Sequence, residues 1–238
     1  MSETITNVSL IDILMHVGYV GYGILLVLLI FSICSWAIIL HKSLKLQQIQ
    51  KESERFLELY HENGDLSEVY SFCLTFRAAP VVRVFKAGYL ELQRIRKEMM
   101  NLKTERKNNM DVIVGDWIEV FTSVLQETLL KEIAILEQFL IFLAVTSSSG
   151  PLLGLLGTVW GVMDSFWLIG TQGYSSLGAI APGISSALVT TIAGLLTAIP
   201  AALAYNYLLN RVKMMSLEME CFASGLTNVV RKEFRKAL

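Results

Sequence analysis

The chain has 238 residues, of which 53% are hydrophobic and 17% charged, and its formal net charge is −1. Soluble domains carry about 25% charged residues, so this composition argues against a soluble protein. The lack of a basic surplus argues against nucleic acid as a partner, and three widely separated cysteines indicate neither a disulfide framework nor a metal site.

The first apolar segment follows a short N-terminal stretch, residues 1–17. No Asp, Glu, Lys or Arg occurs between Ile13 and His41, and residues 18–41 are long enough to cross about 30 Å of hydrocarbon as a helix. A cleaved signal peptide fits less well, because a basic n-region and a small-residue cleavage pattern are missing. We therefore predict a retained transmembrane helix over residues 18–41.

Residues 42–137 are rich in charge and almost free of Gly and Pro, which predicts a cytoplasmic helical domain. Asp65 stands where a helix N-cap is expected. Asp116 and Glu119 have capping-box spacing, and we expect them to begin a helix that runs through Leu136 into the next membrane span. Strand periodicity is missing, so the predicted fold class is all-α, an integral membrane protein with long cytoplasmic helical extensions.

The second half contains two further spans. From Gln138 to Asn210 the only charged residue is Asp164, and a polar, glycine-containing stretch interrupts this run. We predict transmembrane helix 2 with its cytoplasmic extension at 138–169, a loop at 170–179, transmembrane helix 3 at 180–208 and a C-terminal helix at 209–238.

The basic residues predict the orientation of the three spans. All 20 Lys and Arg residues lie within 42–131 or from Arg211 onward. Because cytoplasmic segments retain the excess of Lys and Arg, we expect residues 1–17 and the loop 170–179 to be periplasmic and the C-terminal helix to be cytoplasmic.

The second and third spans both carry a face of small residues. Glycines recur at helical spacing in each, which allows helix backbones to approach closely; they are Gly150, Gly154, Gly157, Gly161, Gly183 and Gly194. Hydroxyl side chains lie beside these faces. Two interpretations stay open: the faces pack helices while the hydroxyls bond to their own helix, or they form a polar track around a pore or partner helix.

The middle of each span lacks carboxylates, Lys, Arg and His. Proton relays in membranes normally use such groups, so a titrating residue would have to come from another chain if protons cross here. Spacing typical of a catalytic triad or a metal site is also missing, and we expect no enzyme, no metal and no cofactor.

Several motifs resemble those of the TolQ/ExbB/MotA proton-channel family, and they occur in family order. They are SWAIIL (35–40), VFKAGYLEL (84–92), GLLGTVWGVM (154–163), APGI (181–184), GLLTAIPA (194–201) and YN (205–206). The resemblance implies a homopentamer in the bacterial inner membrane whose second and third helices line a pore. Two transmembrane helices of a TolR/ExbD-like partner would occupy that pore, with a partner aspartate carrying the proton, which is the coupling ion.

The resemblance also implies roles for individual residues. By motif position, Thr158 and Thr191 correspond to the family's pore threonines; the further pore-lining candidates are Ser147, Ser186 and Thr190, and Pro200 joins the six glycines as a packing residue. Two positions depart from the family pattern: Ser186 stands where TolQ- and ExbB-like chains carry a glutamate, and Asp164 where a neutral polar residue or His is usual.

Within the family, the short N-terminus and three spans look most like TolQ. This implies a Tol-Pal role, in which a TolA-like protein is energised to maintain the outer membrane during cell division. An ExbB-like subunit that energises TonB-dependent transport is the near alternative, and a MotA-like protein fits less well because it resembles a four-span design. A passive membrane scaffold is an alternative from a different class.

Overall fold

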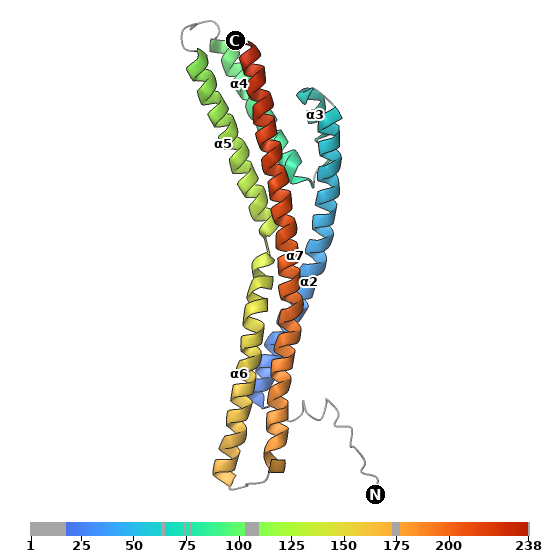
Figure 1. Ribbon diagram of the computed structural model, residues 1–238, viewed down its shortest axis with the longest axis vertical. Coiled ribbons are helices and arrows are strands. Elements are labelled where there is room, and N and C mark those ends of the chain that lie inside the picture. Colours follow the sequence, from blue (N-terminus) through green and yellow to red (C-terminus); the bar gives the residue numbers. More distant parts are fainter. Residues whose placement is uncertain are drawn as a thin grey trace. The chain divides into compact units, whose positions relative to one another are not determined.

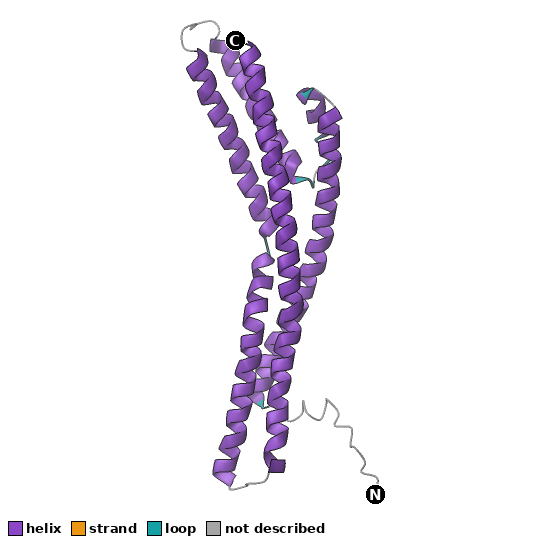
Figure 2. Ribbon diagram, viewed as in Figure 1, coloured by secondary structure: helices purple, strands orange, loops and turns teal. Residues whose placement is uncertain are grey.

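The computed structural model describes residues 18–62, 65–73, 75–76, 78–102, 110–172 and 177–237. Within these ranges every regular element is a helix (Figures 1 and 2), which confirms the all-α prediction. The helices are α2 (Tyr19–Glu62), α3 (Leu66–Phe72), α4 (Pro80–Leu102), α5 (Met110–Glu137), α6 (Leu140–Gln172) and α7 (Leu177–Ala237). The predicted N-terminal stretch and the centre of the predicted loop 170–179 lie outside the described residues.

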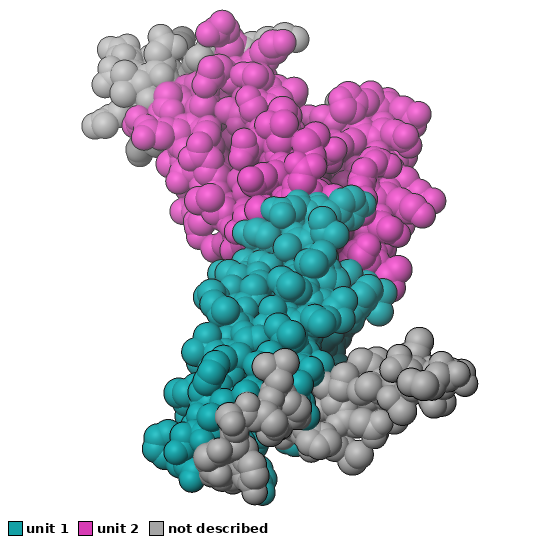
Figure 3. Space-filling model, turned by 60° about the horizontal axis from the view of Figure 1, so that its bottom comes forward, with its two compact units in different colours: residues 1–41, 139–207 teal, residues 42–138, 208–238 magenta. Residues whose placement is uncertain are grey.

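Among the described residues, three helices are long and apolar enough to cross a membrane, namely α2, α6 and α7. The chain divides into two compact units (Figure 3), one made of residues 1–41 and 139–207 and the other of residues 42–138 and 208–238. We call the first the apolar unit and the second the charged unit. The three predicted transmembrane helices are confirmed as helices of suitable length and composition, and the chain is an integral membrane protein.

The apolar unit has small residues inside and large apolar residues outside. On α7, Ala187 and Ala198 are buried, whereas Leu188 and Leu203 on the opposite face are more than half exposed. A helix with this distribution packs against protein on one face and suits hydrocarbon on the other. The α2 helix joins the unit through aromatic packing, since the rings of Phe31 and Phe142 meet edge to face with centroids 5.7 Å apart.

The structure corrects the expectation of one continuous helix from Asp116 into the second span. Helix α5 ends at Glu137 and α6 begins at Leu140, because Phe139 has a φ of 71°, in the left-handed region. Such a conformation costs a non-glycine residue about 1–2 kcal/mol and cannot continue a right-handed helix.

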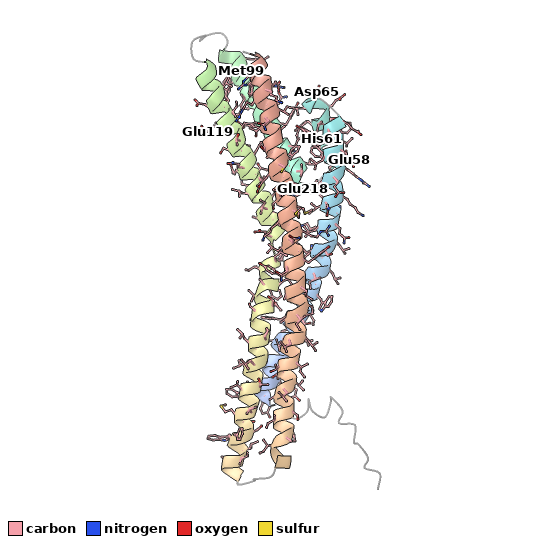
Figure 4. All side chains as sticks on the ribbon, in the orientation of Figure 1. Glu58, His61, Asp65, Met99, Glu119 and Glu218 are labelled. Carbon is pink, nitrogen blue, oxygen red and sulfur yellow. The ribbon has the colours of Figure 1, made fainter. Side chains whose placement is uncertain are left out.

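The expected start of this helix at Asp116 is also wrong. Helix α5 begins at Met110, and its apolar face already includes Val114, which is buried together with Trp117 and Phe121. These residues recur at helical spacing across Asp116, so the acid lies in the exposed interior of a helix. By contrast, Asp65 is the N-cap of α3, as predicted, and its carboxylate accepts a hydrogen bond from the Ser67 amide at 2.9 Å (labelled in Figure 4).

An aromatic cluster forms the core of the charged unit. Phe56 of α2 and Phe85 of α4 are fully buried, with ring centroids 5.6 Å apart. Phe222 of α7 packs against Phe56 at 6.2 Å and against Tyr60 at 5.0 Å. Rings at these distances and tilts stabilise a core beyond the area that they bury, so three helices far apart in sequence meet at this cluster.

One ion pair of the charged unit is largely buried. Arg83 of α4 donates two hydrogen bonds to the Glu132 carboxylate of α5, at 2.6 and 2.5 Å, and the Glu132 side chain is 7% exposed. Two parallel bonds to a carboxylate fix both distance and orientation. Glu127, on the same helix, pairs with Lys131 at the exposed surface.

We expect Glu132→Gln to destabilise the protein because a neutral amide cannot balance the Arg83 charge. The Arg83 side chain is 38% exposed and regains water, so the expected loss is moderate, about 1–2 kcal/mol. Thermal unfolding of the full chain in detergent measures it. Glu127→Gln is the matched control and should leave the midpoint unchanged; an equal effect of both variants would contradict the role given to burial.

Candidate functional site

Helices α6 and α7 approach each other backbone to backbone in the apolar unit. A Cβ atom placed on Gly194 would lie 2.6 Å from the Gly150 carbonyl oxygen and 3.1 Å from the Gly154 Cα. A Cβ on Gly154 would lie 2.9 Å from the Thr191 Cα. The 2.6 and 2.9 Å distances are too short for a real Cβ contact, and the obstructing atoms are backbone, so only glycine allows this approach.

A cluster of threonine hydroxyls lies at this contact, around the Gly154 carbonyl. Thr191 donates to that oxygen at 3.0 Å, and the Thr190 hydroxyl lies 3.2 Å from it and 2.6 Å from the Ala187 carbonyl. The Thr158 and Thr191 hydroxyl oxygens are 3.2 Å apart. We call Thr158, Thr190 and Thr191 the threonine cluster.

The members of the threonine cluster differ in burial. Thr190 is 1% exposed and lies directly over Gly157, where a Cβ would overlap its side chain. Thr158 and Thr191 are half-buried. A hydroxyl can donate and accept a hydrogen bond but does not titrate in the physiological range. The cluster can therefore solvate a carboxylate brought by another chain, whether that group is charged or neutral.

A cavity of about 240 Å³ adjoins the threonine cluster and is lined by Asp164, Ser165, Ser186 and Thr190. Ser165 donates to the Gly161 carbonyl and Ser186 to the Gly183 carbonyl, each at 2.8 Å. Because these hydroxyl protons are engaged by their own helices, the oxygen lone pairs remain for the cavity. Together with the exposed Asp164 carboxylate, they form the polar part of a lining that is otherwise made of glycines and apolar side chains. This polar part offers hydrogen-bond acceptors, which suit a cation, a proton donor or water.

The remaining predicted residues lie apart from the threonine cluster or serve as close contacts. Ser147 donates to the Ala144 carbonyl of its own helix at 2.8 Å. A Cβ on Gly161 would lie 2.6 Å from the Ala187 Cβ, and one on Gly183 would overlap the Ser165 hydroxyl. Pro200 lies inside the continuous helix α7.

Two buried hydroxyls, Ser35 and Thr146, are not among the predicted site residues. Both lack a hydrogen-bond partner within the described part of the chain. Their positions inside apolar runs carry no sequence signal that separates them from other serines and threonines of membrane helices.

Titratable groups whose pKa is displaced occur in the charged unit. Burial raises the pKa of the Cys73 thiol to about 11, so this cysteine stays neutral and is a poor nucleophile. Burial, and then the neighbouring Glu54, raise the pKa of Glu218 (labelled in Figure 4). Among the described residues, His, Cys, Asp and Glu do not gather into a group that could hold a metal ion.

These features define a helical membrane protein with a hydroxyl-lined contact between two glycine-rich spans. The sequence profile of the MotA/TolQ/ExbB proton channel family matches residues 88–221. The Tol-Pal system protein TolQ of Haemophilus influenzae is 30% identical over 234 residues, covering 97% of this chain and 98% of that protein. The chain belongs to the MotA/TolQ/ExbB proton channel family.

Further relatives come from two branches of the family. The Tol-Pal system protein TolQ of Pseudomonas aeruginosa is 28% identical over 233 residues, 97% of this chain and 96% of its own length. The biopolymer transport protein ExbB of Neisseria meningitidis is 28% identical over 209 residues, 86% of this chain and 89% of its own length. The two TolQ relatives thus align with more of the chain than this ExbB relative does.

The glycine contact leads to a prediction for Gly194→Ala. The added methyl would meet the Gly150 carbonyl and the Gly154 backbone, so α6 and α7 must separate at a cost of about 1–3 kcal/mol. Gly225→Ala, on the same helix, has open space at its Cβ and should stabilise the protein by about 0.5–1 kcal/mol.

Thermal unfolding of the two full-length variants in the same detergent measures this difference. The midpoints should move in opposite directions. Equal stabilisation by both substitutions would contradict the close backbone contact between α6 and α7.

Proposed function

We propose that this chain is the TolQ-like proton-channel subunit of an inner-membrane motor that couples proton-motive force to work on the cell envelope in a Tol-Pal system. Membership of a proton channel family and the near full-length similarity to two TolQ proteins support this function. The observation that carries it is the threonine cluster, where hydroxyls from α6 and α7 meet at 3.2 Å beside a glycine contact.

The proposed mechanism divides proton transfer between two kinds of chain. Asp164 is the only acidic or basic residue from Gln138 to Asn210, so the pore wall supplies hydroxyls and a partner subunit supplies the central carboxylate. In this proposal an aspartate of a TolR/ExbD-like partner passes Thr158 and Thr191. When the aspartate is charged, the two hydroxyls rotate their protons to it from the Leu155 and Gly154 carbonyls; when it is protonated, they return to these carbonyls and accept a hydrogen bond from it.

The proposed assembly is a homopentamer in the bacterial inner membrane, with a periplasmic N-terminus and a cytoplasmic C-terminus. The location of every Lys and Arg in residues 42–131 or 211–238 supports this orientation. A pore around partner helices is supported by the polar, half-buried side of the threonine cluster. A TolA-like protein would receive the work, and neither a cofactor nor an enzymatic step is part of the mechanism.

Two alternatives remain distinct from this proposal. An ExbB-like subunit would energise TonB-dependent transport, and the ExbB relatives at 28% identity favour it as the second candidate. A passive scaffold would use the glycine faces only to pack helices, and its function would not respond to an uncoupler.

We expect Thr158→Val and Thr191→Val to abolish proton-dependent function while the protein still assembles. Valine has nearly the same shape but removes the hydroxyl that would solvate the partner carboxylate. Detergent resistance of cells that rely on this chain, with and without an uncoupler, measures Tol-Pal function; growth on siderophore iron measures the ExbB-like alternative.

Thr197→Val is the matched control for these variants. Thr197 lies on α7 and its hydroxyl donates to the Ala193 carbonyl of its own helix at 2.9 Å. It should retain function, and native electrophoresis should show equal assembly for all three variants. Full function of Thr158→Val and Thr191→Val would overturn the threonine assignment, and loss of assembly instead of proton dependence would favour the scaffold.

The shared cavity connects the two departures from the family pattern. Asp164 and Ser186 both line it, so Asp164 can provide, from α6, the carboxylate that TolQ- and ExbB-like chains carry on the third span. We therefore expect Asp164→Asn to impair function strongly and Asp164→Asn with Ser186→Glu to restore part of it. Ser186→Glu alone should impair function, because two carboxylates in one small cavity repel each other.

The control for this exchange is Asp164→Asn with Ser185→Glu. Ser185 is the exposed neighbour of Ser186 and does not line the cavity, so its glutamate should restore nothing. The same detergent-resistance measurement applies. Full function of Asp164→Asn would show that the carboxylate is dispensable.

A further inference from the structure

The charged unit contains a basic pocket whose lining includes residues from α2, α4 and α5. Its volume is about 340 Å³, and its lining includes Lys42, Lys45, Leu46, Gln48, Arg83 and Leu136. Three of the nine lining residues carry a positive charge, and leucines contribute to an apolar wall. We refer to this cavity as the basic pocket.

Lys42 is the most buried cation of the basic pocket, with 4% of its surface exposed. An ammonium group has three donors and no acceptor. Among the described residues, its hydrogen-bond partner is the Ile135 carbonyl, at a long 3.3 Å. Burial, and then the charge of Lys45, lower the pKa of Lys42. A single neutral acceptor thus compensates this buried charge incompletely.

The carboxylates near the basic pocket bind groups other than Lys42 and Lys45. Glu132 binds Arg83 through two hydrogen bonds and balances its charge. Glu52 accepts from the Ala78 amide and from the Gln48 side chain, each at 3.0 Å. Within the described residues, Lys42 and Lys45 form no ion pair with a carboxylate. The basic pocket therefore holds two cations whose charge is not balanced by a carboxylate of the described residues.

The basic pocket lies where apolar sequence meets charged sequence. Lys42 is the first charged residue after the uncharged run from Ile13 to His41. Leu136 lies two residues before Gln138, where the nearly uncharged run of the second half begins. Both of these segments adjoin predicted membrane spans, so their residues lie at the depth of lipid headgroups. A phosphate ester at this depth can reach the lysines while its glycerol and acyl carbons contact the leucines.

We propose that the basic pocket binds the phosphate of an anionic phospholipid headgroup, with Lys42 and Lys45 as the cationic donors. Inorganic phosphate shares the same chemistry but lacks the carbon chains that the apolar wall and the membrane boundary fit. The bound lipid supplies the negative charge that Lys42 lacks and anchors the start of the charged unit at the membrane surface. This site is independent of proton transfer and of the Tol-Pal assignment.

The test is native mass spectrometry of the purified full-length oligomer titrated with phosphatidylglycerol, phosphatidylcholine or inorganic phosphate. The test variant is Lys42→Gln with Lys45→Gln. The matched control is Lys51→Gln with Lys131→Gln, which removes two exposed charges from the same helices, α2 and α5, that line the pocket. Lys45→Gln alone is included because Lys45 is exposed and its loss does not disturb buried packing.

We expect wild type and control to bind phosphatidylglycerol in preference to phosphatidylcholine, with no displacement by millimolar phosphate. Each pocket lysine should raise the affinity for phosphatidylglycerol about five-fold. The double variant should therefore bind this lipid about 25-fold more weakly, and Lys45→Gln about five-fold more weakly. Unchanged binding in Lys45→Gln and the double variant would overturn the proposal, as would equal binding of the two lipids. Displacement by phosphate would identify a soluble anion as the ligand instead of a lipid.

Discussion

The backbone contact between α6 and α7 is the constraint on which the candidate site depends. Gly150, Gly154 and Gly194 leave no room for a side chain between the two helices, so the Gly154 carbonyl becomes accessible to hydroxyls of the opposite helix. The cross-helix bonds from Thr190 and Thr191 exist only at this separation. In hydrocarbon, where water does not compete, such bonds and close packing hold helices together in place of the hydrophobic effect.

The same contact explains why the side chains between α6 and α7 can form hydrogen bonds to a charged group but are not charged themselves. Close backbones admit only small side chains, and a carboxylate or lysine between α6 and α7 would need both space and water. A hydroxyl group can donate its proton to a carbonyl of its own helix and still accept a hydrogen bond through a lone pair, as Ser165 and Ser186 can. Asp164, the one charged residue from Gln138 to Asn210, is accordingly exposed at the cavity.

The sequence was sufficient for the number of spans and for the faces of the third one, because charge distribution and apolar periodicity are local properties. The sequence was not sufficient to predict the contact between the Thr158 and Thr191 hydroxyls. The two residues are 33 positions apart, and their contact depends on how two helices cross. The break at Phe139 has no Gly, Pro or Asn to signal it, because the residue that adopts the left-handed conformation is a phenylalanine. Capping-box spacing at Asp116 was misleading, because acids three residues apart also occur on the exposed face of a continuing helix.

The charged unit buries two charged side chains, Glu132 and Lys42, and the protein compensates their charges differently. This difference bears on what the protein binds. Glu132 lies opposite a guanidinium that matches its two oxygens, so its desolvation is offset within the chain. Lys42 is buried to a similar degree, yet its described partner is one carbonyl and its neighbour Lys45 has the same sign. A cation in that environment lowers its free energy either by losing its proton or by gaining an anion. At the boundary of a membrane, where phospholipid phosphates are abundant, the second route keeps the charge and connects the helical unit to the lipid surface.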